Sequence, residues 1–272
     1  MTLARFNRQE FKGERWDYQQ GEHVADIQPS QGGKTHWMYE LADATDFEGK
    51  PPVALVIKAV DPTPATMAKK LGWKEIHAWP PPKVYPWQNR PPGYNLWPKH
   101  NLTMADNALE LTQAAQEREF RKLFLSARKG GQPIIAGELY GLLAELHLRA
   151  LLIEGVSRGS SARSPIWYDT QKPSGTQGVS MPGQFFNCPT HLFLGYDPVE
   201  TNRKRFSEIG GINTQLVMET VSGCRPSCPP DCAQHIRVVP TRTPYGVKPV
   251  SELLYINKNG PRGGYMCIIG VH

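Results

Sequence analysis

Long apolar stretches are missing from this sequence, and their absence excludes several classes of protein. No run in the 272 residues approaches the roughly 20 apolar residues that a membrane-spanning helix needs. Residues 1–16 carry mixed charges and lack the apolar region of a secretory signal peptide. Internal repeats and low-complexity tails are also lacking. We therefore expect a cytoplasmic protein that does not enter a membrane, folded as one α/β domain over residues 1–272.

The sequence has no long run of charges of one sign. The net charge of +6 permits binding to a polyanion, but the basic residues are dispersed. The two local concentrations, residues 118–129 and 203–205, are read first as solvated helix faces. Charge alone therefore does not establish a nucleic-acid partner.

The run from Glu22 to Leu41 predicts a phosphate-binding loop. A short apolar strand is followed by a loop that ends Gly-Gly-Lys-Thr and then by a helix. In that arrangement the backbone N–H groups of the loop and the N-terminal end of the helix converge on one anion. Lys34 would contact the β- and γ-phosphates and Thr35 would hold Mg²⁺. The residues expected to bind the nucleotide are Ser30, Gln31, Gly32, Gly33, Lys34, Thr35 and His36.

One position of this motif departs from its pattern G-x-x-x-x-G-K-[ST]. Gln28 stands where a glycine normally begins the turn. The alternative interpretation is a surface turn without a ligand, since Gly-Gly is a common loop dipeptide. The strand before the loop and the helix after it favour nucleotide binding.

Alternating strand and helix patterns predict a mostly parallel sheet flanked by helices. The closing segments, Ser251–Lys258 and 264–271, predict a C-terminal β hairpin. The other predicted strands are Val24–Ile27, Val53–Ile57, Glu75–Trp79, Pro133–Ala136, Pro165–Tyr168 and Thr190–Gly195. The predicted helices are Thr35–Ala44, Pro64–Leu71, Met104–Arg128, Leu139–Ile153 and Pro198–Ile209.

A nucleotide hydrolase also needs an acid for the Mg²⁺ shell and a base for the attacking water. Glu138 directly follows a buried strand and is the candidate base, although an exposed acid at a helix N-terminus is the alternative. Gly137 occupies the position where an aspartate is normally found. Asp26 and Asp169 are candidates to replace that carboxylate, and the sequence places neither.

Polar and basic residues around the next strand supply further candidates. Gln171 follows this strand, and its amide can donate to a phosphate oxygen and accept from water. Arg158 and Arg163 lie on a loop of small residues before it. A guanidinium offered from there to a neighbouring subunit would stabilise transition-state charge.

Two segments have unusual compositions, a predicted loop insertion over residues 222–248 and a loop over residues 80–101. Residues 222–248 hold three of the five cysteines, and Cys224, Cys228, Cys232 and His235 resemble a zinc cluster. The C-x3-C-x3-C spacing is not the usual C-x2-C knuckle, so free thiols are favoured over zinc. Residues 80–101 are dense in proline and aromatic residues and predict a loop without regular structure. We expect it to pack on the core or contact another subunit, with base stacking as the alternative.

The order of these motifs resembles the FtsK/HerA superfamily of P-loop ATPases, in particular small stand-alone members of phage or mobile-element type. The segments that carry the resemblance are QQGEHVADIQPSQGGKT, VALVIKAVDPT, GQPIIAGELYGLL, SRGSSARSPIWYDTQKPSG, FNCPTHLFLGYDPVETNRKRFSEIGG and ELLYINKNGPRGGYMCIIGV. The third of these matches the family's Walker B strand in position.

The resemblance implies a RecA-like domain that binds ATP and Mg²⁺ and forms a ring, a hexamer, around double-stranded DNA. It implies Lys34 and Thr35 at phosphate and Mg²⁺, Glu138 as base, Gln171 as sensor, and Arg158 or Arg163 acting in trans. Other phage or conjugation proteins are further expected partners. An ATP-driven DNA translocase, of the kind that packages genomes, is thus the leading functional hypothesis.

Two other functions stay open. The departures at Gln28 and Gly137 motivate a degenerate P-loop protein with weak or no hydrolysis, acting as a structural or regulatory assembly subunit. A P-loop kinase ranks last, because no arginine-rich acceptor lid is evident.

Overall fold

The computed structural model describes residues 3–29, 32–58, 61–98, 108–171, 173–175, 179–225, 251–260 and 265–270. The chain divides into two compact units, which are described separately. The first comprises Met1–Tyr18, Val24–Lys34 and Thr170–His272, and the second comprises Gln19–His23 and Thr35–Asp169.

Parallel strands form the centre of the second unit. They are β3 (Val53–Leu55), β4 (Lys74–Ile76), β5 (Tyr94–Leu96), β6 (Ile134–Ala136) and β7 (Ile166–Thr170), whose last residue belongs to the first unit. They are ordered β7-β6-β3-β5-β4, with Val53 opposite both Tyr94 and Ile134. Their residues are buried except at β4, the edge strand. Such continuous apolar runs are typical of parallel strands covered on both faces.

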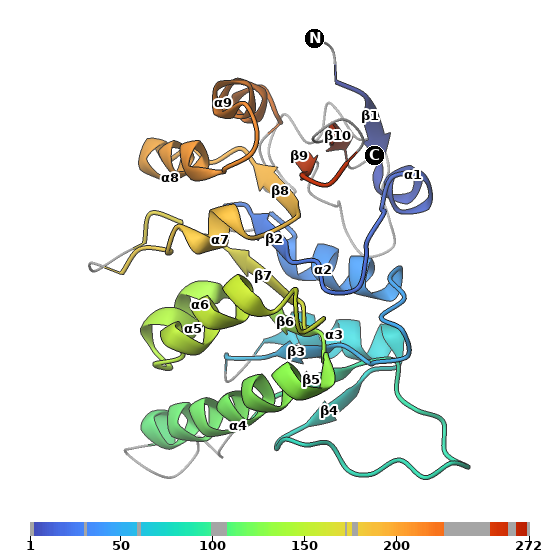
Figure 1. Cartoon of the computed structure of the whole chain (residues 1–272). Helices are drawn as coiled ribbons and strands as arrows, with labels where there is room; N and C mark the ends of the chain where they lie inside the picture. The colour runs from blue at the N-terminus through green and yellow to red at the C-terminus, as the bar shows by residue number, and fades with distance from the viewer. Residues whose placement is uncertain are drawn as a thin grey trace. The chain divides into compact units, whose positions relative to one another are not determined.

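Helices cover both faces of these strands. Figure 1 shows α4 (Ala108–Gly130), α5 (Leu139–Ala144) and α6 (Arg149–Arg158) on one side, and α2 (Lys34–Asp43) and α3 (Pro62–Leu71) on the other. Local sequence sets the ends of α3: the Asp61 carboxylate accepts the Thr63 N–H at 3.0 Å, and Gly72 ends the helix at φ +71°. An N-cap acid and a left-handed glycine are the expected signals at these two positions.

The first unit combines parallel and antiparallel strands. They are β1 (Arg5–Asn7), β2 (Val24–Ile27), β8 (His191–Gly195), β9 (Glu252–Asn257) and β10 (Tyr265–Gly270), ordered β1-β10-β9-β8-β2. Its helices are α1 (Arg8–Glu14), α7 (Gln184–Asn187), α8 (Glu200–Lys204) with the 3₁₀ turn η1 (Arg205–Glu208), and α9 (Thr214–Ser222). Aromatic rings pack in its core. The ring centroid of Phe11 lies 4.6 Å from that of Tyr255 in an edge-on arrangement, and the Tyr255 centroid lies 5.0 Å from that of Phe193.

Strand β9 runs antiparallel to β8 and β10, and β9 and β10 form the hairpin at the end of the described chain. The prediction of a mostly parallel α/β sheet with helices on its faces and a C-terminal hairpin is therefore confirmed. In the described ranges no helix combines the length and the apolar character required to cross a bilayer.

Two sequence predictions of local structure were wrong. The proline-rich segment contains strand β5, because residues 93–97, between Pro92 and Pro98, hold no proline and the N–H groups of Tyr94–Leu96 can pair with neighbouring strands. The helix predicted over Leu139–Ile153 is two helices, α5 and α6, separated at His147 with φ +47°. Burial of Leu146 and Leu148 on either side of that turn overrides the helical pattern.

The rest of the proline-rich segment divides into a packed part and an exposed part. The Trp79 indole, directly before residue 80, donates to the Ser126 hydroxyl at 2.7 Å, which ties the start of the segment to α4. Tyr85 and Trp87 instead stack on each other at 4.8 Å and are 53% and 77% exposed. Packing therefore explains Trp79, whereas subunit contact and base stacking stay open for the exposed pair.

A buried histidine gives this fold a predicted dependence on pH. His23 is 1% exposed, its Nδ1 accepts the Ile166 N–H at 2.9 Å, and burial lowers its pKa to about 4. Between pH 6.5 and 4 the unfolded chain binds a proton that the folded chain excludes, so stability falls as pH falls. This one site should contribute a slope of up to about 1.4 kcal/mol per pH unit.

The measurement is urea unfolding across this pH range for the wild type and His23→Gln, whose amide oxygen can still accept the Ile166 N–H. The difference in unfolding free energy between the two should narrow steadily below pH 6.5. Parallel curves would show that His23 does not titrate on unfolding.

Candidate functional site

The described part of the loop between β2 and α2 has two positions at which glycine is required. Gly33 has φ +78°, a conformation that favours glycine. A side chain at Gly32 would begin 2.5 Å from the Gln28 amide oxygen, so only glycine fits there without a shift. Ser30 and Gln31 lie outside the described residues. The described part of the loop thus requires both glycines for conformational or steric reasons.

Gln28 fills the place of the expected glycine without straining the backbone. Among the described residues the non-glycine positions with positive φ are Glu48, Glu138, His147 and Arg163, so Gln28 adopts an ordinary conformation. Its side chain is 2% exposed, and its amide donates to Asp26 Oδ1 at 2.5 Å. The departure from the motif is therefore accommodated by a buried hydrogen bond.

Lys34 is 5% exposed, and its ammonium donates to the Pro29 carbonyl at 2.8 Å. This contact folds the lysine back over the loop that precedes it. The positive charge of Lys34 consequently lies at the end of the loop, at the first residue of α2. His36, two residues on, is exposed on the first turn of the helix.

A pocket of the second unit begins at the residue that follows Lys34. It lies where β3, β6 and β7 end, and the carboxyl ends of parallel strands are the usual place for ligands in α/β sheets. Its polar lining comprises Thr35, Lys58, Asp61, Glu138 and Asp169, and its other lining residues are Met38, Tyr39, Ala54, Leu55, Val56, Ile57, Pro64, Ile135 and Gly137. Two predicted site residues, Thr35 and Glu138, therefore line one pocket.

Glu138 is held in a sparsely populated conformation at φ +54° and ψ +54°. Its N–H donates to Asp169 Oδ1 at 3.0 Å, and its carboxylate forms an ion pair with Lys58. Burial would lower the pKa of Lys58, but the hydrogen bond to Glu138 and the nearby carboxylates raise it overall. A left-handed non-glycine residue at a pocket is a frequent mark of a functional site.

Gly137 leaves room in the pocket that Asp169 approaches from the neighbouring strand. A Cβ at position 137 would lie 3.7 Å from Asp169 Oδ2 and 3.8 Å from the Leu55 carbonyl oxygen, both ordinary contacts. Asp169 is 2% exposed. Of the two acids considered as substitutes for the missing aspartate, Asp169 lines this pocket, and Asp26 accepts from Gln28.

The two predicted arginines lie at the other end of strand β7. Arg163 forms an ion pair with Glu48, and Arg158 is 3.9 Å from Glu154 with 82% of its side chain exposed. Both precede β7, whereas Asp169 is near its end. Five strand residues span about 16 Å, so neither arginine reaches the pocket of its own chain.

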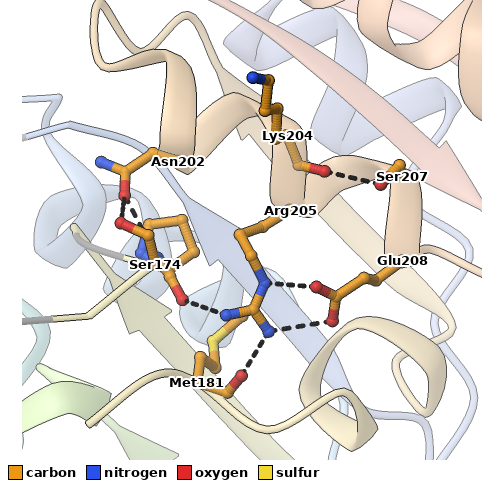
Figure 2. A network of polar contacts seen from close by, with 8 residues as sticks. Ser174, Met181, Asn202, Lys204, Arg205, Ser207 and Glu208 are labelled. Carbon is orange, nitrogen blue, oxygen red and sulfur yellow. Dashed lines mark hydrogen bonds and ion pairs between the residues drawn. The ribbon is translucent and has the colours of Figure 1, made fainter. Parts of the chain in front are cut away.

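Gln171 is half-buried directly after β7, at the start of a loop that a polar network anchors. Arg205 donates to the Pro173 carbonyl at 3.0 Å, the Met181 carbonyl at 2.6 Å and both oxygens of Glu208. Figure 2 shows Arg205 at the centre of its contacts with Met181 and Glu208. Asn202 accepts the Ser174 N–H at 3.2 Å in the same network. The basic run 203–205, expected to be a solvated helix face, thus contributes a loop anchor at Arg205, which sequence reasoning missed.

Replacement of Arg205 by alanine should lower the free energy of unfolding by about 2–3 kcal/mol, because several charge-assisted hydrogen bonds are lost together. Arg205→Lys should recover less than half of this loss, since an ammonium lacks the planar fork that reaches two carbonyls and a carboxylate. Urea denaturation of both variants measures the effect. A loss below about 0.5 kcal/mol in Arg205→Ala would mean that the network contributes little.

The predicted zinc cluster falls mostly outside the described residues. Cys228, Cys232 and His235 are among those not described, and within the described part of the chain no three metal-binding side chains come together. Cys224 is buried, its thiol donates to the Thr220 carbonyl at 3.4 Å, and burial raises its pKa to about 12. For residues 222–248, free thiols in preference to a zinc site therefore stay a prediction.

Comparison with solved structures finds similar folds among viral and conjugation NTPases. The genome packaging NTPase B204 from Sulfolobus turreted icosahedral virus 2, in complex with ATPγS, has 11% identity and a TM-score of 0.46 over 92% of this chain and 98% of its own. B204 from Sulfolobus turreted icosahedral virus, a DNA-packaging ATPase, has 11% identity and a TM-score of 0.47 over 91% and 96%. The pCW3 conjugation coupling protein TcpA with ATPγS has 14% identity and a TM-score of 0.41 over 91% and 60%.

No protein-family model and no curated protein matches the chain. Because the identities and TM-scores are low, the function is inferred from the residues of this chain alone.

Proposed function

We propose that this chain is an ATP-dependent DNA motor of the FtsK/HerA type, whose P-loop binds ATP and Mg²⁺. The observation that carries the proposal is that Thr35, Glu138 and Asp169 line one pocket, directly after a glycine loop that ends in Lys34. A hydroxyl, a candidate base and a buried acid are the groups that nucleotide hydrolysis requires beside a phosphate-binding loop.

The residues present fit a nucleotide with a divalent cation. At Gly33 a Cβ would lie 3.7 Å from Arg8 Nη2, an ordinary contact, so the main chain there leaves room for phosphate, and Lys34 supplies one positive charge. The hydroxyl of Thr35 and the carboxylate of Asp169 are hard oxygen donors of the kind that Mg²⁺ prefers. When bound, Mg²⁺ would neutralise charge on the β- and γ-phosphates.

Each residue has a distinct part in this proposal. Lys34 exchanges its contact with the Pro29 carbonyl for a phosphate oxygen. Glu138 leaves its ion pair with Lys58 and orients the attacking water as general base. Gln171, at the tip of β7, senses the γ-phosphate through its amide.

The position of the arginines supports an assembly in this proposal. Arg158 and Arg163 precede a strand whose far end borders the pocket, so their proposed role is to complete a site on a neighbouring subunit. A closed ring, a hexamer, offers every subunit such a neighbour. The DNA in the centre would be held through its phosphates without regard to sequence.

A degenerate, assembly-type function is the second candidate. The resting ion pair between Lys58 and Glu138, together with the departures at Gln28 and Gly137, favours it. In that case nucleotide binds weakly or not at all, and the ring, if formed, is structural.

Phosphate release by the wild-type protein, with and without linear duplex DNA at about 50 and 200 mM salt, separates these functions. We expect ATP turnover that rises several-fold with DNA and loses this stimulation at the higher salt, because a phosphate-backbone grip is sensitive to salt. Native mass spectrometry with ATP should show a ring. Negligible turnover under all conditions would favour the assembly function, and a strict monomer at micromolar concentration would contradict a ring motor.

A further inference from the structure

The chain has lost the acid that normally ends the strand before Glu138, and the space next to that position is bordered by another acid. Gly137 directly follows β6 and has no side chain, and a Cβ built on it would lie 3.7 Å from Asp169 Oδ2. Asp169 comes from β7, which pairs in parallel with β6 so that Ala136 lies opposite Tyr168. The carboxylate of Asp169 therefore approaches position 137 from the neighbouring strand β7.

We propose that Asp169 supplies the carboxylate of the Mg²⁺ shell in this chain, replacing an aspartate at position 137. The inference rests on the proposed nucleotide site and assigns a residue that the motif does not predict. Asp169 lines the same pocket as Thr35, whose hydroxyl is the other oxygen donor from the protein. Its near-complete burial keeps the carboxylate in one position, as an orienting group requires.

Asp169 also positions the candidate base. Its Oδ1 accepts the Glu138 N–H at 3.0 Å, which stabilises the left-handed backbone of Glu138. One carboxyl group therefore serves Glu138 through Oδ1 and faces position 137 through Oδ2. In the usual motif, two adjacent residues at the end of one strand bind the metal and act as the base. In this proposal the two roles come from the ends of two neighbouring strands, and the hydrogen bond between the Glu138 N–H and Asp169 links them.

The other acids near the loop have different structural roles. Asp61 lines the pocket, but its Oδ1 caps α3 by accepting the Thr63 N–H. Asp26 accepts from the buried Gln28 amide. Of these acids, Asp169 is the one that approaches the vacated position 137.

The test moves the carboxylate back to β6. Asp169→Asn removes the charge but keeps an oxygen that can accept the Glu138 N–H. In Gly137→Asp/Asp169→Asn a carboxylate returns from position 137, where the new Cβ meets no atom closer than 3.7 Å. Binding of a fluorescent ATP analogue is titrated with Mg²⁺ and with EDTA, and bound Mn²⁺ is followed by electron paramagnetic resonance, so neither readout depends on turnover.

In Asp169→Asn we expect metal-free nucleotide affinity within about twofold of the wild type and Mn²⁺ affinity about 10- to 100-fold weaker. The double variant should recover Mn²⁺ affinity to within about threefold. Asp61→Asn tests the competing acid, and Asp46→Asn, an exposed residue outside the pocket, is the matched control.

Several results would overturn the inference. Undiminished Mn²⁺ affinity in Asp169→Asn, a larger loss in Asp61→Asn, or a loss that the double variant does not restore would each show that Asp169 is not the replacing ligand. Nucleotide binding that is tight but insensitive to metal in the wild type would overturn this inference and leave the nucleotide site standing. Failure of the wild type to bind the analogue at all would remove the proposed function as well.

Discussion

Replacement of Lys34 by alanine is expected to weaken ATP binding roughly a hundredfold, equivalent to about 2.7 kcal/mol. Lys34 is the cation of the loop, it is nearly buried, and its ammonium already lies within hydrogen-bond distance of the loop backbone. Charge-assisted hydrogen bonds to phosphate are among the strongest a side chain can make. Titration calorimetry with ATP and Mg²⁺ measures the loss directly.

The control for this prediction separates charge from packing. Lys34→Met keeps the apolar stem in its buried place and removes only the ammonium, so it should lose as much affinity as Lys34→Ala. Lys70→Ala, at the exposed end of α3, removes a charge of the same sign away from the loop and should leave binding unchanged. Wild-type affinity in Lys34→Met would refute a role for this ammonium in phosphate binding.

Replacement of Glu138 by glutamine should lower ATP turnover by roughly 100- to 10,000-fold while ATP binding stays within about threefold of the wild type. Glutamine keeps the shape of the side chain and the backbone contact to Asp169, but its amide cannot accept a proton from water. Phosphate release under saturating ATP measures turnover, and calorimetry measures binding on the same samples.

Glu110→Gln, on the exposed face of α4, is the matched control and should turn over ATP like the wild type. Substantial turnover in Glu138→Gln would exclude this residue as the base. If the wild type and Glu138→Gln are equally inactive while Lys34→Ala still impairs ATP binding, the chain is a nucleotide-binding assembly subunit. The two substitutions thus separate binding from hydrolysis.

Local sequence was sufficient to predict the elements that build the loop. Strand β2 was predicted with its observed bounds. Helix α2 is shifted by one residue toward the N-terminus from its predicted bounds. Both depend on short-range signals, namely an apolar run, paired glycines and a helix start. Strand β5 and the break between α5 and α6 were missed, because pairing with β3 and burial of Leu146 and Leu148 decide them.

The site shows the same division at the level of single residues. Glu138 was predicted from its place after a buried strand, and Thr35 from its motif. Asp169 was left as one of two candidate acids, since only the pairing of β6 with β7 brings it beside position 137. Arg205 was grouped with solvated charges, because its carbonyl acceptors lie 24 and 32 residues earlier in the chain.

The sequence by itself determined the alternation of strands and helices, the glycine loop with its lysine, and the absence of a glycine at position 28 and of an acid at position 137. These features are set by neighbours within a few residues, where backbone sterics and periodicity act. Only the tertiary structure decided that the Gln28 side chain is buried and that Asp169, from β7, approaches position 137. Strand order determines which distant side chains meet, and no local pattern encodes that order.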